Sequence, residues 1–177
     1  TVSGCHSVQD EGWDPNECHP TLAGKLGHRH STLTQGIPEG YYVHVLDNSN
    51  PKEWAGIPSC KMPGAKLVHQ LSTDLSGMGR RDGPVRPPHG YGIAMNTGAW
   101  MEAEDVHAAL NTDNALLASL IYHNDKGRFE GTRLRSVADG RWHPDNKVFH
   151  VRAVQGHSIG WLRQDRLNTR LCMDARD

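Results

Sequence analysis

The chain carries, at Val151-Arg152-Ala153-Val154-Gln155-Gly156-His157-Ser158, a short β-type run that ends in a dense cluster of polar residues. Alternate residues of a strand point to opposite faces, so Arg152 and Gly156 share one face while Gln155 and His157 share the other. A planar guanidinium matches the oxygens of a phosphate, and histidine and serine add hydrogen-bond donors beside a glycine that permits close backbone approach. The run therefore predicts a strand that ends at a phosphate or nucleotide site.

The residues before this run predict the rest of a lobe. Apolar residues recur at helical spacing in three segments, at about 67–75, 102–110 and 115–123, and Gly77, Gly79 and Gly83 are expected to end the first helix. Two strands follow, at about 128–135 and 148–154, joined by a turn-rich segment over 136–147. Three helices and then a β-hairpin is the order of a winged helix-turn-helix. We therefore predict an α+β fold with a winged-helix lobe over residues 67–165.

The segments on either side of this lobe carry weaker patterns. Residues 1–66 are rich in glycine, proline, histidine and asparagine, and we expect them to be irregular apart from one strand-like run over 41–46. Residues 166–177 form a basic tail that could begin a further lobe. Cysteine and histidine residues cluster within the first thirty positions, but their spacing fits no common zinc site, so no metal is predicted.

Composition limits the classes of function. A net charge of −1 over 177 residues gives no overall signal for nucleic acid, so any RNA site must be a local patch of cations. The four cysteines lie far apart and give no readable disulfide framework. We find no signal peptide and no apolar run that could span a membrane, so we expect an intracellular protein, cytoplasmic or nuclear, without a membrane partner.

Four elements occur in a fixed order along the predicted lobe. The first is Leu71-Ser72-Thr73-Asp74-Leu75-Ser76-Gly77-Met78-Gly79-Arg80-Arg81, and the second runs from Gly90 to Trp100 and leads into the helix at 102–110. The third is Asp125-Lys126-Gly127-Arg128-Phe129, where a helix gives way to a strand, and the fourth is the RAVQGHS run of residues 152–158. Taken singly, each also fits an ordinary role as an amphipathic helix, a buried tryptophan anchor, a solvated helix end or a strand with a satisfied histidine.

Taken together, the four elements resemble the KptA-type RNA 2'-phosphotransferases, in which they read LSxxLSxxLRHG, a GI or GL pair before GW, DKxRF and RAxQGHS. The chain departs from the family at Gly79, which replaces a leucine, and at Arg81, which stands where the family has a catalytic histidine. An alanine also separates the glycine from Trp100. Because arginine keeps its proton near neutral pH, Arg81 could supply charge but could not act as a general acid or base.

The resemblance implies a two-step reaction in which NAD is consumed as a co-substrate. The 2'-phosphate of a spliced RNA, typically a tRNA, attacks the ribose carbon of NAD and expels nicotinamide. The ribose 2''-hydroxyl then attacks the phosphorus to give ADP-ribose 1'',2''-cyclic phosphate. The resemblance assigns catalytic roles to Arg80, Arg81, Arg128, Arg152 and His157. It assigns substrate binding to Lys126, Gln155, Gly156 and Ser158, and we expect Arg80, Arg128 and Arg152 to converge on one anion site.

A second reading is a non-catalytic winged-helix module that binds RNA or a protein partner. The replacement of the family histidine by Arg81 favours this reading. So does the lack, after residue 158, of the ADP-ribosyltransferase-like second lobe that holds most of the NAD site in the family. We therefore expect this chain by itself to bind 2'-phosphorylated RNA weakly and to turn it over little, since positioning of the reactants supplies roughly 7–11 kcal/mol of catalysis.

Overall fold

The structure is a computed structural model that describes residues 37–46, 48–58, 62–96, 98–160 and 162. Its elements, in chain order, are β1 (Tyr41–Leu46), η1 (Pro51–Trp54), α2 (Ala65–Gly77), η2 (Met78–Asp82), β2 (Met101–Glu102), α3 (Ala103–Leu110), α4 (Asn114–Tyr122), β3 (Phe129–Ser136) and β4 (His150–Ala153). The predicted α+β class is confirmed. Among the described residues, no helix is both long and apolar enough to cross a membrane.

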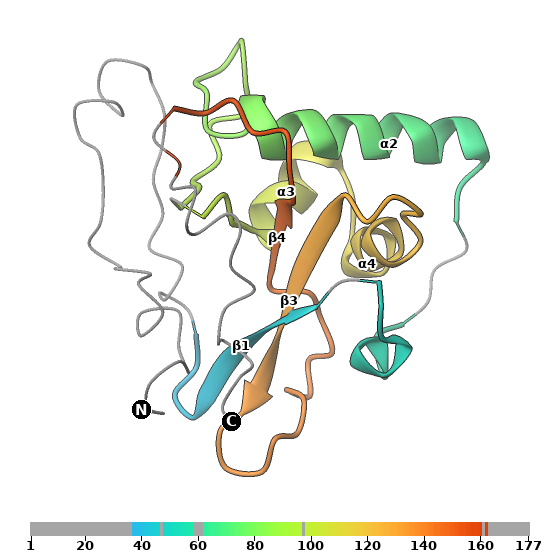
Figure 1. Ribbon diagram of the computed structural model, residues 1–177, viewed down its shortest axis with the longest axis vertical. Helices are drawn as coiled ribbons and strands as arrows, with labels where there is room; N and C mark the ends of the chain where they lie inside the picture. Colours follow the sequence, from blue (N-terminus) through green and yellow to red (C-terminus); the bar gives the residue numbers. More distant parts are fainter. Residues whose placement is uncertain (1–36, 47, 59–61, 97, 161, 163–177) are drawn as a thin grey trace.

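The strands form one antiparallel sheet in the order β1-β3-β4-β2 (Figure 1). The predicted hairpin strands β3 and β4 lie at its centre, where Phe129 pairs with Ala153. Each of them has a second neighbour, so their backbone groups are paired on both sides. The connection between them doubles back on β3 through an isolated bridge between Arg135 and Trp142.

Strand β1 lies before the domain boundary that the sequence suggested near residue 66. It pairs with β3 along its whole length, from Tyr41 opposite Ser136 to Leu46 opposite Gly131. The strand prediction for residues 41–46 is confirmed, and the strand belongs to the same sheet as β3 and β4. Residues 1–36 and the tail at 166–177 lie outside the described residues, so the predictions for them are not tested.

Apolar side chains cover both faces of the sheet. On one face Leu75, Met78, Val106 and other helix residues pack with Phe129 and strand residues. Leu134 lies five positions after Phe129, so it faces the opposite side, where it packs with Val43, Val45 and Trp100. Trp100 is almost fully buried, as the sequence predicted for this anchor.

The first helix, α2, ends at Gly77 within the glycine cluster, as the sequence predicted. The chain continues from α2 as the π-helical segment η2, with Gly79 inside it and Gly83 after it. A Cβ on Gly79 would lie 2.9 Å from the Cβ of Ala153, so only glycine lets η2 approach β4 this closely. The glycine that replaces the family leucine therefore serves helix–strand packing, and it brings Arg80 beside the end of β4.

Candidate functional site

Residues 154–158 form a short segment held between two arginines. The Val154 amide donates to the Arg128 carbonyl at 2.9 Å, and the Ser158 amide donates to the Arg80 carbonyl at 3.0 Å. Four residues of extended chain span at most about 14 Å. The carbonyls of Arg80 and Arg128 are therefore separated by no more than that span plus the lengths of the two hydrogen bonds. The turn therefore links the backbones of Arg80 and Arg128, which are far apart in sequence.

The turn in this segment depends on Gly156, which has a φ of +82°. A Cβ at this position would lie 2.7 Å from an Arg80 guanidinium nitrogen, so the Arg80 side chain packs directly over the glycine. Gln155 and Ser158 on either side are exposed. The glycine thus serves two purposes, because it supplies the left-handed backbone conformation and leaves room for the Arg80 guanidinium.

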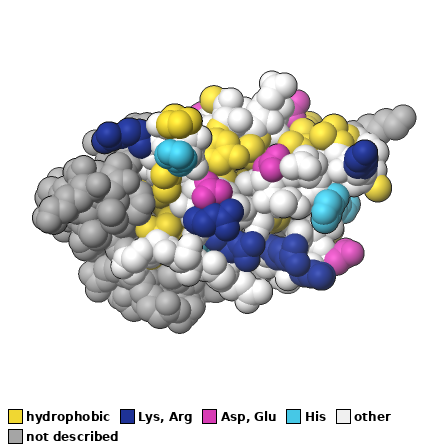
Figure 2. All heavy atoms as spheres, turned by 90° about the horizontal axis from the view of Figure 1, so that it is seen from above, with side chains coloured by type: hydrophobic (Ala, Val, Ile, Leu, Met, Phe, Trp, Pro, Cys, Tyr) yellow, Lys and Arg dark blue, Asp and Glu magenta, His cyan; other side chains and the backbone are white. Residues whose placement is uncertain are grey.

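The groove beside this turn contains two exposed cations of the predicted site. Lys126 and Arg128 line a groove of about 560 Å³ between α2 and the end of α4. The α2 residues that line it include His69 and Ser72, which lie on one face of the helix. We refer to Arg80, Lys126, Arg128 and the turn at residues 155–158 as the basic strip. Figure 2, which views the molecule from above α2, shows a row of Lys and Arg side chains with an acidic side chain beside each end of the row.

Asn124 fixes the loop that carries Lys126 and Arg128, and the sequence reasoning assigned it no role. Its side-chain oxygen accepts the Arg128 amide at 3.0 Å, and its carbonyl accepts the Gly127 amide at 3.0 Å. The same carbonyl accepts the Asn48 side chain at 2.6 Å. Asparagine, aspartate and glycine stand at positions 124, 125 and 127, and these residue types are common in turns. This composition is the signal that could have identified Asn124.

His157 is wedged between β4 and η2 rather than projecting into solvent. Its Nε2 lies 2.8 Å from the Ala153 carbonyl oxygen, so this nitrogen donates and carries the proton. Burial lowers the pKa of His157, and the charges of Arg152 and Arg80 lower it further, while the backbone of Ala153 and Gly79 opposes the shift. The imidazole is therefore neutral near pH 7 and helps hold the turn against η2.

Arg152 does not share an exposed site with Arg80 and Arg128, contrary to the prediction. Its side chain is 3% exposed, and its Nη2 and Nε atoms lie 2.8 and 2.9 Å from Oε1 of Glu130, which is 6% exposed. Its Nη1 donates to the Gly98 carbonyl at 3.1 Å, and the guanidinium lies 4.6 Å from the centre of the Trp100 ring. The physical reason is register: Arg152 pairs with Glu130 across the central strands, so the carboxylate satisfies the guanidinium inside the fold.

Arg81 projects away from the turn and pairs with its sequence neighbour. Its side chain is 65% exposed, and its Nε and Nη2 atoms donate to the two carboxylate oxygens of Asp82 at 2.8 and 3.1 Å. This pair raises the pKa of Arg81, because the carboxylate favours the charged guanidinium. Of the five predicted catalytic residues, Arg128 is thus an exposed cation of the basic strip and Arg80 a half-buried one.

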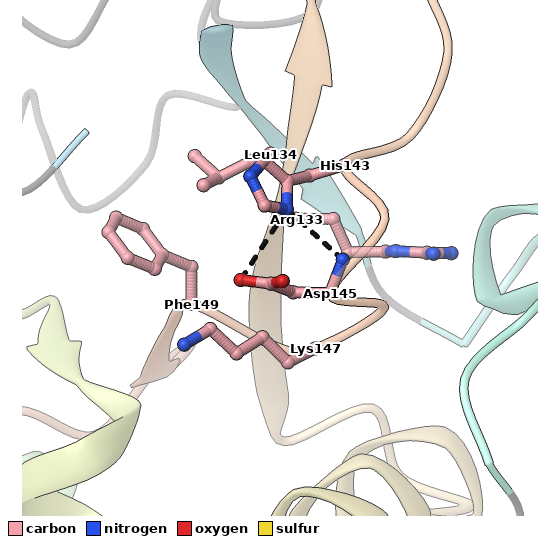
Figure 3. Close-up of a pocket in the computed structure, with 6 residues that line it drawn as sticks. All are labelled: Arg133, Leu134, His143, Asp145, Lys147 and Phe149. Carbon is pink, nitrogen blue, oxygen red and sulfur yellow. Dashed lines mark hydrogen bonds and ion pairs between the residues drawn. The ribbon is translucent and has the colours of Figure 1, made fainter. Parts of the chain in front are cut away.

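A separate surface pocket lies on the far part of β3 and the segment that follows it (Figure 3). His143 and Asp145 face each other there: the Asp145 amide donates to His143 Nδ1 at 3.1 Å, and Oδ2 of Asp145 lies 3.5 Å from the same nitrogen. Burial lowers the pKa of Arg133, at the base of this region, to about 10. The hydrogen bond between Asp145 and His143 therefore lies within a single turn of the chain. No group of three or more potential metal ligands occurs in the part of the chain that the structure describes.

Comparisons with family models, with curated proteins and with solved structures found no match for this chain. The resemblance to the KptA-type 2'-phosphotransferases therefore rests on the four sequence elements, and its functional consequences are proposals.

Proposed function

We propose that this chain binds RNA through its phosphate groups, as a winged-helix lobe related to the KptA-type RNA 2'-phosphotransferases. The observation that carries the proposal is the turn at residues 154–158, whose two ends are tied to Arg80 and Arg128. The Arg80 guanidinium packs over Gly156, and a side chain that is already ordered loses little conformational entropy when it pairs with phosphate oxygens. The exposed Ser158 hydroxyl and Gln155 amide add donors and acceptors between them.

The basic strip has the features of a site for a single strand rather than for a duplex. Its cations lie along a turn and a groove, and no described helix presents a row of them to a major groove. Binding of a single strand releases about 0.7 counterions per phosphate contacted. With Arg80, Lys126 and Arg128 engaged, we expect the logarithm of affinity to fall by about 2 for each tenfold increase in salt.

The 2'-phosphotransferase reaction is the second candidate, and the order of the DKxRF and RAVQGHS elements supports it. In this fold those elements are neighbours, since Val154 bonds to Arg128. A reaction would need NAD held near the basic strip. The resemblance assigns most NAD contacts to a second lobe, so we assign none to the described residues. Because Arg152 is neutralised by Glu130 and Arg81 pairs with Asp82, we expect little turnover from this chain.

Two measurements on the full chain test these proposals. Fluorescence anisotropy with a labelled RNA hexamer should show binding that weakens with salt at the slope given above. A hexamer with one internal 2'-phosphate should bind more tightly than its unphosphorylated counterpart. Arg128→Ala should weaken the binding of both hexamers. Arg141→Ala, on an exposed turn away from the strip, should change neither affinity. Absence of RNA binding at low salt would refute the proposed function.

Incubation of the 2'-phosphorylated hexamer with NAD separates the two candidates. A pure binding module leaves the 2'-phosphate in place. NAD-dependent loss of the phosphate, with release of nicotinamide, would establish the transferase and would show that the buried Arg152 is not needed in an exposed position.

A further inference from the structure

We infer that an aromatic groove next to the basic strip binds a base of the same RNA strand by stacking. This inference rests on the proposed function, because it assigns the occupant of a neighbouring groove once RNA phosphates lie on the strip. The groove has a volume of about 340 Å³. One wall comes from η1 and the residues after it, namely Pro51, Trp54, Ile57 and Pro58, and the other comes from α4, with Tyr122 and His123.

The aromatic groove continues into the groove of the basic strip. Ser119 and His123 line both of them. In Figure 1, α2, α4 and the short helix η1 follow one another down one side of the molecule, which places the two grooves on either side of α4. A chain that lays its phosphates along Lys126 and Arg128 can therefore pass His123 and reach Trp54 without leaving this surface.

The aromatic groove has room for a further ring. Trp54 and Tyr122 are each half-buried, their ring centres lie 5.5 Å apart, and their planes are inclined at 57°, so they do not stack face to face. The exposed His123 ring lies 5.0 Å from Tyr122 at 74°. Every nucleobase presents a flat π face, and aromatic platforms of this kind bind bases with little regard to sequence.

Trp54 is held firmly enough to act as a platform. Arg133 donates from Nη1 to the carbonyls of Glu53 and Ala55, the two neighbours of Trp54, at 2.7 and 2.8 Å. The Glu53 carboxylate in turn lies 2.7 Å from His44 Nε2 in β1. These contacts fix η1 to the sheet, so a base that stacks on Trp54 need not order the loop first.

The charge beside the groove favours RNA over a proline-rich peptide, the other ligand that binds aromatic-lined grooves. Lys126 and Arg128 supply positive charge in the adjoining groove, whose lining contains a single carboxylate, that of Asp125. A polyanion gains from this arrangement, whereas a neutral proline-rich segment gains only the apolar contact.

The test compares two labelled hexamers on the full chain, hexauridylate and an abasic hexamer with the same backbone. Stacking of one base should make hexauridylate bind about 5- to 150-fold more tightly. Trp54→Leu and Tyr122→Leu should reduce this ratio toward one and leave the affinity for the abasic hexamer unchanged, while Trp54→Phe should retain most of the ratio. Tyr41→Leu, at a half-buried tyrosine whose ring lies 4.6 Å from that of His143, is the matched control and should keep the wild-type ratio.

The wild-type comparison needs no variant, so a variant that fails to fold leaves the test intact. Equal affinity of the two hexamers for the wild-type chain would overturn the base-stacking inference while the proposed RNA function stands. Failure of both hexamers to bind would overturn the proposed function as well. Displacement of hexauridylate by a proline-rich peptide, together with equal affinity for the abasic hexamer, would assign the groove to a peptide instead.

Discussion

Replacement of Arg152 by methionine tests whether this arginine supports the fold or contacts RNA. The substitution preserves much of the side-chain volume but removes both contacts to Glu130, at 2.8 and 2.9 Å, and the contact to the Gly98 carbonyl at 3.1 Å. The Glu130 side chain is 6% exposed, so its carboxylate would be left buried without its guanidinium partner. Loss of one member of a buried ion pair costs about 3–5 kcal/mol of stability.

The assay is urea unfolding followed by circular dichroism, with the free energy of unfolding extrapolated to water. Arg152→Met should lower that free energy by about 3–5 kcal/mol, and Glu130→Leu should have a similar effect. The double variant should be more stable than either single variant, because an apolar pair of similar volume replaces both buried charges. Arg141→Met is the control, since Arg141 is 86% exposed in its pair with Asp139 and should cause no measurable loss.

One result would refute the reasoning about Arg152. If Arg152→Met unfolds within about 1 kcal/mol of the wild-type chain and loses RNA affinity at low salt, then the ion pair contributes little. The guanidinium would then have to reach RNA in solution, as the family resemblance implied. A large loss of stability with RNA affinity retained under native conditions supports a structural role.

Three further perturbations address the turn and a helix end. Gly156→Ala places a methyl group 2.7 Å from the Arg80 guanidinium and forces alanine into a φ of +82°, so it should lower stability by about 1–2 kcal/mol and weaken RNA binding in the anisotropy assay. Burial lowers the pKa of His157 below its ordinary value of 6.5, so the unfolded chain takes up this proton first as the pH falls. The free energy of unfolding should therefore decrease below about pH 6.5, and His157→Gln should reduce that decrease in unfolding experiments from pH 7.5 to 5. Asp113→Ala removes the cap in which Asp113 Oδ1 accepts the Leu116 amide at 2.8 Å, and thermal unfolding should show a loss of about 1 kcal/mol without any change in RNA affinity.

Local sequence patterns were sufficient for most of the secondary structure. Helical spacing of apolar residues predicted α2, α3 and α4, and β-type runs predicted β1, β3 and β4. These patterns succeed because the side-chain period of a helix or strand is set by its own backbone. The glycine cluster was correctly predicted to end α2, but the sequence does not show that Ala153 lies against Gly79 or that a π-helical segment follows.

The candidate site likewise combines residues that the local sequence could identify with contacts that only the fold creates. The sequence identified the cations at Arg80, Lys126 and Arg128 and a glycine at 156 that permits close backbone approach, because these are local features. The turn at Gly156 came from the structure. Arg152 could not be assigned from its own surroundings, because its partner Glu130 lies 22 residues away and meets it only through strand pairing. The aromatic groove was missed for a similar reason, since Trp54 and Tyr122 come from segments that the sequence placed in different domains.

Local patterns were thus enough to predict which segments become helices and strands and where positive charge lies along the chain. The tertiary arrangement set which strands are neighbours, that β1 belongs to the sheet, and which arginine is buried. The physical reason is strand register, since it decides which side chain each residue of a central strand faces. Register places Arg152 opposite Glu130, so the pair is retained inside the fold, while Arg128 lies just before β3 and stays exposed.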